Sequence, residues 1–182
     1  MKKILIVLAD GFEEIETVTP IDVLRRAGLE VTVAGLEKKT VTGSHGIKIE
    51  ADILFNDFRE TPDAIVLPGG PGAETLGKSA ELRKVIEYLH KEGKWIGAIC
   101  AAPAVVLGKT SILEGKKATC YPGYEKQLGA KTTFTAERVV KDGRVITSRG
   151  PGSSLEFSLE LVRSVLDPKK AAEVAEKMIA KV

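Results

Sequence analysis

Short apolar runs, separated by longer mixed segments, dominate the pattern of hydrophobic and polar positions along the chain. Runs of four to six apolar residues are typical of strands buried on both faces. They occupy Ile4–Ala9, Val31–Leu36, Ala64–Leu67 and Trp95–Ile99. Apolar residues at helical spacing predict helices over Glu13–Ala27, Ser79–Lys91, Ala101–Leu107, Ser154–Leu166 and from Pro168 onward. Strands that alternate with helices predict an open, mostly parallel sheet covered by helices on both faces.

Four other segments refine this outline. Pro20 lies inside the first predicted helix, so we expect a kink or a helix in two pieces. Residues 38–58 are expected to form short strands or loops, and Thr133–Glu137 a strand. Val139–Ile146 predicts a hairpin, because Asp-Gly at its centre is a strong turn signal.

Composition narrows the class of protein. The 182 residues are 43% hydrophobic, 29% charged and 5% aromatic, and 27 basic against 25 acidic residues give a net charge of +2. Interspersed charges of this kind do not predict nucleic-acid binding. No apolar run approaches the roughly 20 residues of a membrane span, and Lys2-Lys3 leads directly into a strand rather than a signal peptide. We therefore expect one soluble, cytoplasmic α/β domain without nucleic-acid or membrane partners.

Candidate chemistry gathers where strands end, because ligands of such sheets bind beyond the carboxyl ends of the strands. Cys100 follows a predicted strand and has Ala98 and Ala102 two positions to either side. Small residues at these positions are what a nucleophile elbow requires. The following helix would lower the thiol pKa through its N-terminal N–H groups. The alternative interpretation is a buried structural cysteine.

Three carboxylates follow the first strand. Glu13, Glu14 and Glu16 stand at the start of a helix, where negative charge suits the helix dipole, and this alone explains the first two. If the loop lines the same crevice as Cys100, one carboxyl can reach the sulfur. Such a carboxyl would have a raised pKa and act as a hydrogen-bond donor.

The loop Pro68-Gly69-Gly70 follows the third strand and fits no phosphate-binding motif. Its N–H groups could form an oxyanion hole with that of Ala101. Of the two histidines, His45 follows a turn and could border the crevice, whereas His90 suits a helix C-terminus. No cluster has the sequence spacing of metal ligands, and Cys100 and Cys120 do not form a C-x-x-C pair.

Four segments together resemble the ThiJ/PfpI superfamily. They are Ala-Asp-Gly-Phe-Glu-Glu-Ile-Glu-Thr at 9–17, Val-Leu-Pro-Gly-Gly at 66–70, Ala-Ile-Cys-Ala-Ala-Pro at 98–103 and Thr-Ser-Arg-Gly-Pro-Gly at 147–152. They are most similar to the branch that contains the parkinsonism-associated protein deglycase and the bacterial YajL-type proteins. The resemblance implies that residues 1–182 form one class I glutamine amidotransferase-like domain. It implies a flavodoxin-like three-layer α/β sandwich with a nucleophile elbow, usually in a homodimer.

Matching positions one by one, the resemblance implies a nucleophilic Cys100 with the carboxylic acid of Glu16 beside it. It also implies backbone donors and basic positions near the pocket or the dimer contact. The donors are Gly69, Gly70 and Ala101; the basic positions are Arg25, Arg26 and Arg149; and Tyr121, His45 and Pro151 are further pocket candidates. Tyr121 stands where many animal members have a histidine, and His45 replaces an arginine. Ala101 occupies the position of a histidine in the protease-like branch, which argues against a peptidase.

The resemblance implies conversion of methylglyoxal to lactate without glutathione, or removal of early glyoxal adducts from proteins, by a cysteine nucleophile. We expect no cofactor and no metal. The expected partners are a small dicarbonyl or a glycated protein, and a second copy of the chain. The alternative is a redox-sensing stress protein or chaperone that uses oxidation of Cys100. An intracellular cysteine peptidase is less consistent with the residues. So is a thiamine-precursor kinase or synthase, because no phosphate-binding loop is present.

Overall fold

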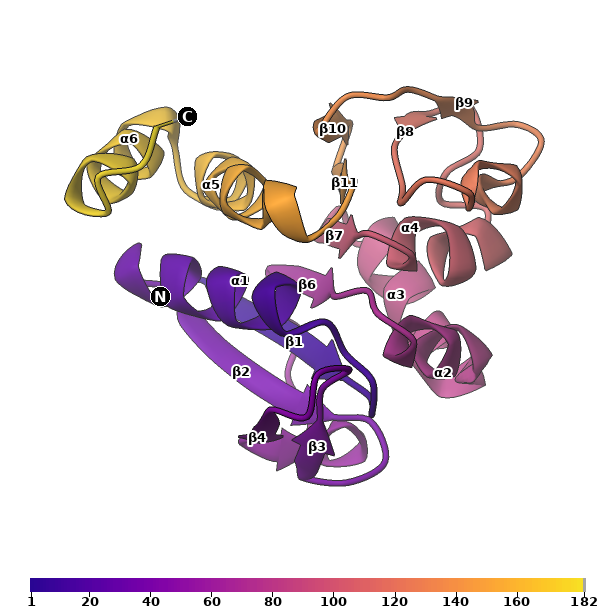
Figure 1. The fold of residues 1–182 in the computed structure, drawn as a ribbon, viewed down its shortest axis with the longest axis horizontal. Coiled ribbons are helices and arrows are strands. Elements are labelled where there is room, and N and C mark those ends of the chain that lie inside the picture. The colour runs from indigo at the N-terminus through magenta and orange to yellow at the C-terminus, as the bar shows by residue number, and fades with distance from the viewer. Residues whose placement is uncertain (182) are drawn as a thin grey trace.

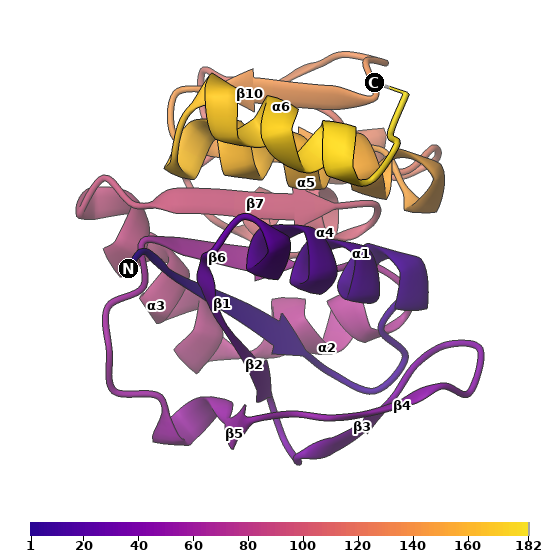
Figure 2. The ribbon, with the colours of Figure 1, turned by 90° about the vertical axis from the view of Figure 1, so that its left-hand side faces the viewer.

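A seven-stranded sheet forms the centre of the computed structural model, which describes residues 1–181. Its strand order is β10-β11-β7-β6-β1-β2-β5, and every neighbouring pair is parallel except β10 with β11 (Figures 1 and 2). The strands are β1 (Lys3–Leu8), β2 (Glu30–Gly35), β5 (Ile53–Leu54), β6 (Ala64–Leu67), β7 (Trp95–Ile99), β10 (Val139–Asp142) and β11 (Val145–Ser148). The predicted parallel sheet and the hairpin are confirmed.

Helices cover both faces of the sheet, so the chain forms the expected three-layer α/β sandwich (Figure 1). One layer contains α1 (Glu14–Arg26), α5 (Ser154–Val165) and α6 (Pro168–Lys177). The opposite layer contains α2 (Gly72–Lys78), α3 (Ala80–Lys91) and α4 (Ala102–Val105).

Two small sheets and four 3-10 turns complete the described structure. One small sheet pairs β3 (Thr40–Thr42) with β4 (Lys48–Glu50), and the other pairs β8 (Lys117–Ala118) with β9 (Thr133–Phe134). The strand predicted over Thr133–Glu137 is therefore shorter than expected. The 3-10 turns are η1 (Phe55–Asp57), η2 (Leu107–Lys109), η3 (Glu125–Leu128) and η4 (Pro151–Ser153).

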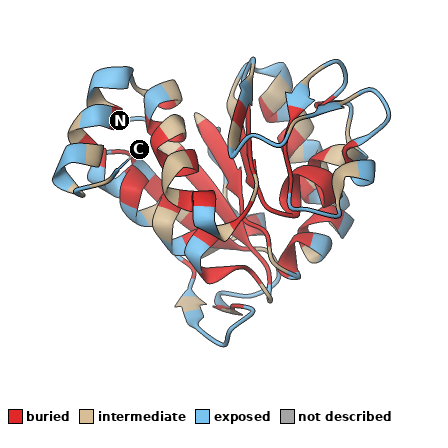
Figure 3. Cartoon of the chain, turned by 45° about the horizontal axis from the view of Figure 1, so that its top comes forward, coloured by how far each residue is buried: buried red, intermediate tan, exposed pale blue. Residues whose placement is uncertain are grey.

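The core lies along the central strands, which are buried on both faces (Figure 3). Leu5, Ile65 and Ile96 are fully buried. Phe157 of α5 packs onto the sheet at Gly97, where a Cβ atom would lie 3.1 Å from its ring. Burial of this apolar surface is the main term that stabilises the fold. Over residues 1–181, no helix combines the length and the apolar character needed to cross a membrane.

The helices differ from the prediction at three places. Helix α1 is one helix through the buried Pro20 and is not divided into two pieces, although Pro20 has no N–H to donate to the carbonyl four residues earlier. Helix α2 is an element the sequence did not predict. Its Gly72 serves close packing, because a Cβ atom there would lie 2.8 Å from the carbonyl oxygens of Ala9 and Asp10. The helix expected over Ala101–Leu107 is shortened to α4, followed by η2.

Candidate active site

Cys100 occupies the sharp turn between β7 and α4. Its φ angle is 65°, in the left-handed region that residues with a side chain rarely adopt. Its N–H donates to the Ser148 carbonyl at 2.9 Å, and its carbonyl accepts from the Tyr121 N–H at 2.8 Å. The turn is therefore held on both sides by backbone hydrogen bonds. The predicted nucleophile elbow is confirmed as a geometry, with a side chain that is 7% exposed.

Glu16 lies in the first turn of α1 and is fully buried. Its Oε2 atom accepts a hydrogen bond from the Gly69 N–H at 2.8 Å. Its Oε1 atom has no hydrogen-bond partner among the described residues. Glu13 caps the same helix, because its carboxylate accepts from the Glu16 N–H at 2.7 Å. These contacts fix the Glu16 carboxyl in place and leave one of its oxygens available.

The sulfur of Cys100 and the carboxyl of Glu16 meet at Gly69. A Cβ atom on Gly69 would lie 2.9 Å from the Cys100 Sγ atom and 2.6 Å from the Glu16 Oε2 atom. Only glycine leaves this space empty. The ends of β1, β6 and β7 are adjacent in the sheet, which brings the three loops together. Their predicted convergence is confirmed.

Burial controls the protonation of both groups. It raises the pKa of Glu16 to about 7, against the opposing effects of Cys100 and the Gly69 N–H. It also raises the pKa of the Cys100 thiol to about 12, and the charge of Glu16 adds to the effect. The N–H groups of Gly70 and Ala101 act in the opposite direction but do not prevail. The expected lowering of the thiol pKa is therefore wrong, because α4 is short and burial outweighs its N–H groups.

The backbone donors differ from the expected set. Gly70 and Ala101 direct their N–H groups at the sulfur, as predicted. Gly69 does not, because its N–H is taken by Glu16. Gly70 must be glycine, since its φ is 76° and a Cβ atom would lie 2.4 Å from the Gly11 carbonyl oxygen. The site thus has two donors at the sulfur and a third that orients the carboxyl.

Tyr121 borders the site from the segment after β8. The position of a Cβ atom on Gly150 would be 3.2 Å from the Tyr121 ring and 3.9 Å from Glu16 Oε1. The ring is 45% exposed and stands edge-on to Tyr124, with centroids 6.5 Å apart. Pro151 follows Gly150 and begins η4 at the same border. Tyr121 and Pro151 are therefore placed at or next to the site, as expected.

The three predicted basic residues have recorded contacts with groups other than Cys100 and Glu16. Arg26 is at the far end of α1 from Glu16, where it pairs with Asp22 at 2.7 Å. Arg25 pairs with Asp52. Arg149 packs on the ring of Phe134 at 5.9 Å and donates to the Ala136 carbonyl. The recorded contacts of Arg25, Arg26 and Arg149 are thus with groups other than Cys100 and Glu16, and their expected place near the pocket or a dimer contact stays a prediction.

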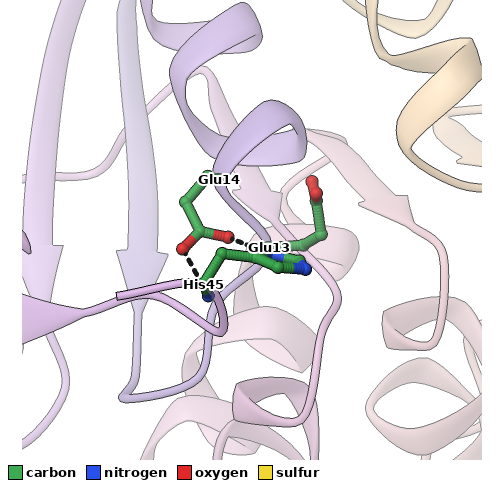
Figure 4. A group of neighbouring side chains, drawn as sticks. All are labelled: Glu13, Glu14 and His45. Atoms are coloured by element: carbon green, nitrogen blue, oxygen red, sulfur yellow. Dashed lines mark hydrogen bonds and ion pairs between the residues drawn. The ribbon is translucent and has the colours of Figure 1, made fainter. Parts of the chain in front are cut away.

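His45 is held by Glu14 (Figure 4). The Glu14 carboxylate accepts from the His45 N–H at 2.6 Å and from its ring Nδ1 at 2.9 Å. Burial raises the pKa of Glu14, but hydrogen bonds from His45 and Ser44 outweigh it and lower the pKa to about 2. The same contact raises the pKa of His45. His45 therefore borders the N-terminus of α1, where its recorded hydrogen-bond partners are Glu14 and Ser44.

Glu13, Glu14 and His45 also form the one cluster within residues 1–181 whose donor atoms suit a metal ion. One atom from each lies within 4.8 Å of the others. Sequence spacing could not predict it, because the turn between β3 and β4 supplies the histidine. Gly43 allows this turn to approach α1 closely, because a Cβ atom there would lie 2.3 Å from Glu14 Oε1. Hydrogen bonds between Glu14 and His45 account for this arrangement without an ion.

Comparisons with known proteins agree with this geometry. Residues 2–164 match the DJ-1/PfpI family. The chain is 48% identical over 177 residues to Protein DJ-1 homolog B of Arabidopsis thaliana, covering 96% of this chain and 40% of that one. It is 37% identical to Glutathione-independent glyoxalase DJR-1.2 of Caenorhabditis elegans, covering 93% and 91% of the two chains. It thus spans less than half of the Arabidopsis relative but nearly all of the nematode one.

A solved structure extends the likeness to three dimensions. The structure of oxidized DJ-1 from Toxoplasma gondii superposes with a TM-score of 0.93 at 38% sequence identity, over the whole of both chains. The match covers the elements that position Cys100 and Glu16. With the sequence match over residues 2–164, these findings show that the chain belongs to the DJ-1/PfpI family.

Proposed function

We propose that the protein is a cofactor-independent glyoxalase that converts methylglyoxal to lactate and also acts on early glyoxal adducts of proteins. One observation carries the proposal. A buried carboxyl with a pKa of about 7 lies beside a cysteine held in a nucleophile elbow. A group whose pKa is near the working pH can both accept and return a proton. The nematode relative named a glutathione-independent glyoxalase supports the same activity.

The first step adds the thiol to the aldehyde carbon of the substrate. The S–C bond forms as the thiol proton passes to the Glu16 carboxylate, so a thiol with a raised pKa needs no prior ionisation. The N–H groups of Gly70 and Ala101 lie close enough to the sulfur to stabilise the oxyanion of the hemithioacetal.

The second step moves a proton between two neighbouring carbons. Glu16 first gives the thiol proton to the hemithioacetal oxyanion, which restores its carboxylate. It then removes the proton from the carbon bound to sulfur and returns it to the adjacent carbonyl carbon, while the hydroxyl proton moves to the neighbouring oxygen. The product of this shift is a thioester of the hydroxy acid. Water then cleaves the thioester, releasing lactate and restoring the thiol. The overall reaction adds one water to methylglyoxal and needs no oxidant, reductant or metal.

Lactate formation from methylglyoxal in the absence of glutathione tests the proposal. The wild type is compared with Cys100→Ser and with Cys120→Ser, since Cys120 is a buried thiol outside the proposed mechanism. We expect turnover in the wild type and in Cys120→Ser, and only background in Cys100→Ser. Equal rates in wild type and Cys100→Ser would refute a cysteine-dependent glyoxalase.

A second candidate function uses the same residues. We propose that oxidation of Cys100 to the sulfinate regulates a chaperone activity, with protonated Glu16 donating a hydrogen bond to a sulfinate oxygen. The raised pKa of Glu16 favours this, because the carboxyl keeps its proton to nearly neutral pH. Mild peroxide should add two oxygens at Cys100 and none at Cys120, which is fully buried. Holdase activity that is unchanged after stoichiometric oxidation contradicts the proposal.

We also propose that the chain forms a homodimer through α1 and the turn between β3 and β4. Ile15 and Val18 lie one turn apart on α1 and are 53% and 48% exposed, and Ile47 is 55% exposed. Adjacent exposed apolar side chains indicate a contact surface. Sedimentation of the wild type and of Ile15→Glu/Val18→Glu tests this. We expect a dimer and a monomer, respectively; a monomeric wild type overturns the proposal.

A further inference from the structure

We propose that Tyr121 selects the substituent of the dicarbonyl, favouring a flat aromatic group over methyl. For its substrate class this inference rests on the glyoxalase function proposed above. Tyr121 is anchored to the nucleophile, because its N–H donates to the Cys100 carbonyl at 2.8 Å. Its ring is nevertheless 45% exposed. A rigidly placed and half-exposed aromatic ring beside a reactive thiol is a binding surface for an apolar group of the substrate.

The two oxygens of Glu16 set the direction in which the substrate lies. Oε2 is on the side of Gly69 and the sulfur, and Oε1 is on the side of Gly150 and the Tyr121 ring. The carbon bonded to sulfur therefore lies near Oε2. The neighbouring carbonyl carbon lies near Oε1, which is buried and has no donor of its own. The substituent on that second carbon is consequently directed toward Tyr121.

Gly150 and Tyr124 shape the space that receives this substituent. A Cβ atom on Gly150 would lie 3.2 Å from the Tyr121 ring, so the absence of a side chain leaves the inner part of the ring open. Tyr124 braces the ring edge-on, at an interplanar angle of 71°. The Tyr124 N–H also donates to the Tyr121 carbonyl. The ring is thus held in place before the substrate arrives, which lowers the entropy that binding must overcome.

Alkylation of Cys100 by two haloketones tests the inference without requiring turnover. Phenacyl bromide carries a phenyl group and bromoacetone a methyl group. In each case the S–C bond forms, bromide leaves with the electron pair of the C–Br bond, and the thiol proton is lost to Glu16 or buffer. Intact mass gives the rate at Cys100, with Cys100→Ser as the blank. The alkylation ratio is the rate with phenacyl bromide divided by the rate with bromoacetone. Dividing it by the same ratio for free N-acetylcysteine gives the selection that the protein adds.

We expect this ratio to decrease roughly three- to tenfold in Tyr121→Ala, the range expected for loss of one aromatic contact. Tyr121→Phe should keep the ratio, because the ring and not the hydroxyl makes the contact. Tyr88→Ala is the matched control, since Tyr88 is a tyrosine on α3 with a similar exposed fraction of 51%. Thermal unfolding of each variant checks that the fold is intact, and Tyr121→Leu provides a second variant that keeps apolar bulk without a flat ring.

The outcomes separate this inference from the proposed function. The kcat/KM values for phenylglyoxal and methylglyoxal should change in parallel with the alkylation ratio. If the wild type turns over neither dicarbonyl but Tyr121→Ala still lowers the alkylation ratio, the glyoxalase function is wrong and the selective surface stands. If Tyr121→Ala leaves the alkylation ratio unchanged, or Tyr121→Phe lowers it equally, the inference is overturned whatever the turnover.

Discussion

Gly69 and Glu16 are joined by a hydrogen bond of 2.8 Å from the backbone N–H of the glycine to the Oε2 atom of the carboxyl. The Gly69 carbonyl in turn accepts from the Glu13 N–H at 3.1 Å. The loop after β6 and the start of α1 are thus tied together in both directions. This link holds the carboxyl beside Cys100, and it depends on a residue without a side chain.

Replacing Gly69 by alanine should disrupt the site. The new Cβ atom would lie 2.5 Å from the Cys100 Cβ atom and 2.6 Å from Glu16 Oε2, so both side chains must move. We expect a loss of about 1–3 kcal/mol in the free energy of unfolding, together with slower alkylation of Cys100. Gly152→Ala is the control, because a Cβ atom there meets open space. Equal results for the two variants in urea denaturation would contradict the close packing at Gly69.

Glu16→Gln should remove most of the turnover and keep the fold. The amide retains the shape of the carboxyl but cannot accept and return a proton. We expect kcat/KM for methylglyoxal to decrease by roughly 100-fold or more. Glu74→Gln, an exposed carboxyl in the first turn of α2, should leave the activity unchanged. Full activity of Glu16→Gln would assign the proton transfer to another group.

The buried Glu16 should also make stability depend on pH. Its pKa is raised from 4.5 to about 7 by burial, so the folded protein binds this proton more tightly than the unfolded chain. The stabilisation is complete below about pH 4.5 and is lost as the pH rises through about 7. Glu16→Gln lacks this loss. Its melting temperature relative to wild type should therefore be higher at pH 8 than at pH 4.5, and a constant difference contradicts the raised pKa.

The contact between Glu14 and His45 should also make the stability of the protein depend on pH. Glu14 should lower the stability as the pH falls, which is opposite to Glu16, whereas His45 should lower it as the pH rises, as Glu16 does. Glu14 has a lowered pKa, so its contribution is present above pH 4.5 and is lost as the pH falls toward 2. His45 has a raised pKa, so its contribution is complete below 6.5 and lost as the pH rises through the folded-state value. His45→Asn should lower the melting temperature more at pH 5.5 than at pH 9. His90→Asn, on α3, serves as the comparison.

Much of the framework follows from local features of the sequence. The continuous apolar runs of β1, β6 and β7 identify strands buried on both faces. Asp142-Gly143, where β10 ends and the turn begins, identifies the hairpin. The small residues around Cys100 identify the elbow, since a left-handed turn with a φ of 65° tolerates little bulk beside it. Each of these features depends on neighbouring residues along the chain.

Other features were decided by contacts between distant segments. Helix α1 remains continuous through Pro20 because it packs against α5. The Gly69 N–H has a carboxylate partner 53 residues away, so its role as an oxyanion donor could not be judged from its loop alone. Arg26 pairs with Asp22, and His45 pairs with Glu14 across 31 positions of the chain.

The protonation of Cys100 and Glu16 also depends partly on the local sequence and partly on contacts between distant segments. The sequence by itself determined which groups meet at the strand ends: a thiol, a carboxyl and glycine N–H groups. Only the tertiary structure decided their pKa values, because these depend on how much water surrounds each group. The Glu16 carboxyl is fully buried and the Cys100 thiol nearly so. Removing the charged forms from water destabilises them more than the short helix α4 and the backbone N–H groups stabilise them. Both pKa values are therefore raised.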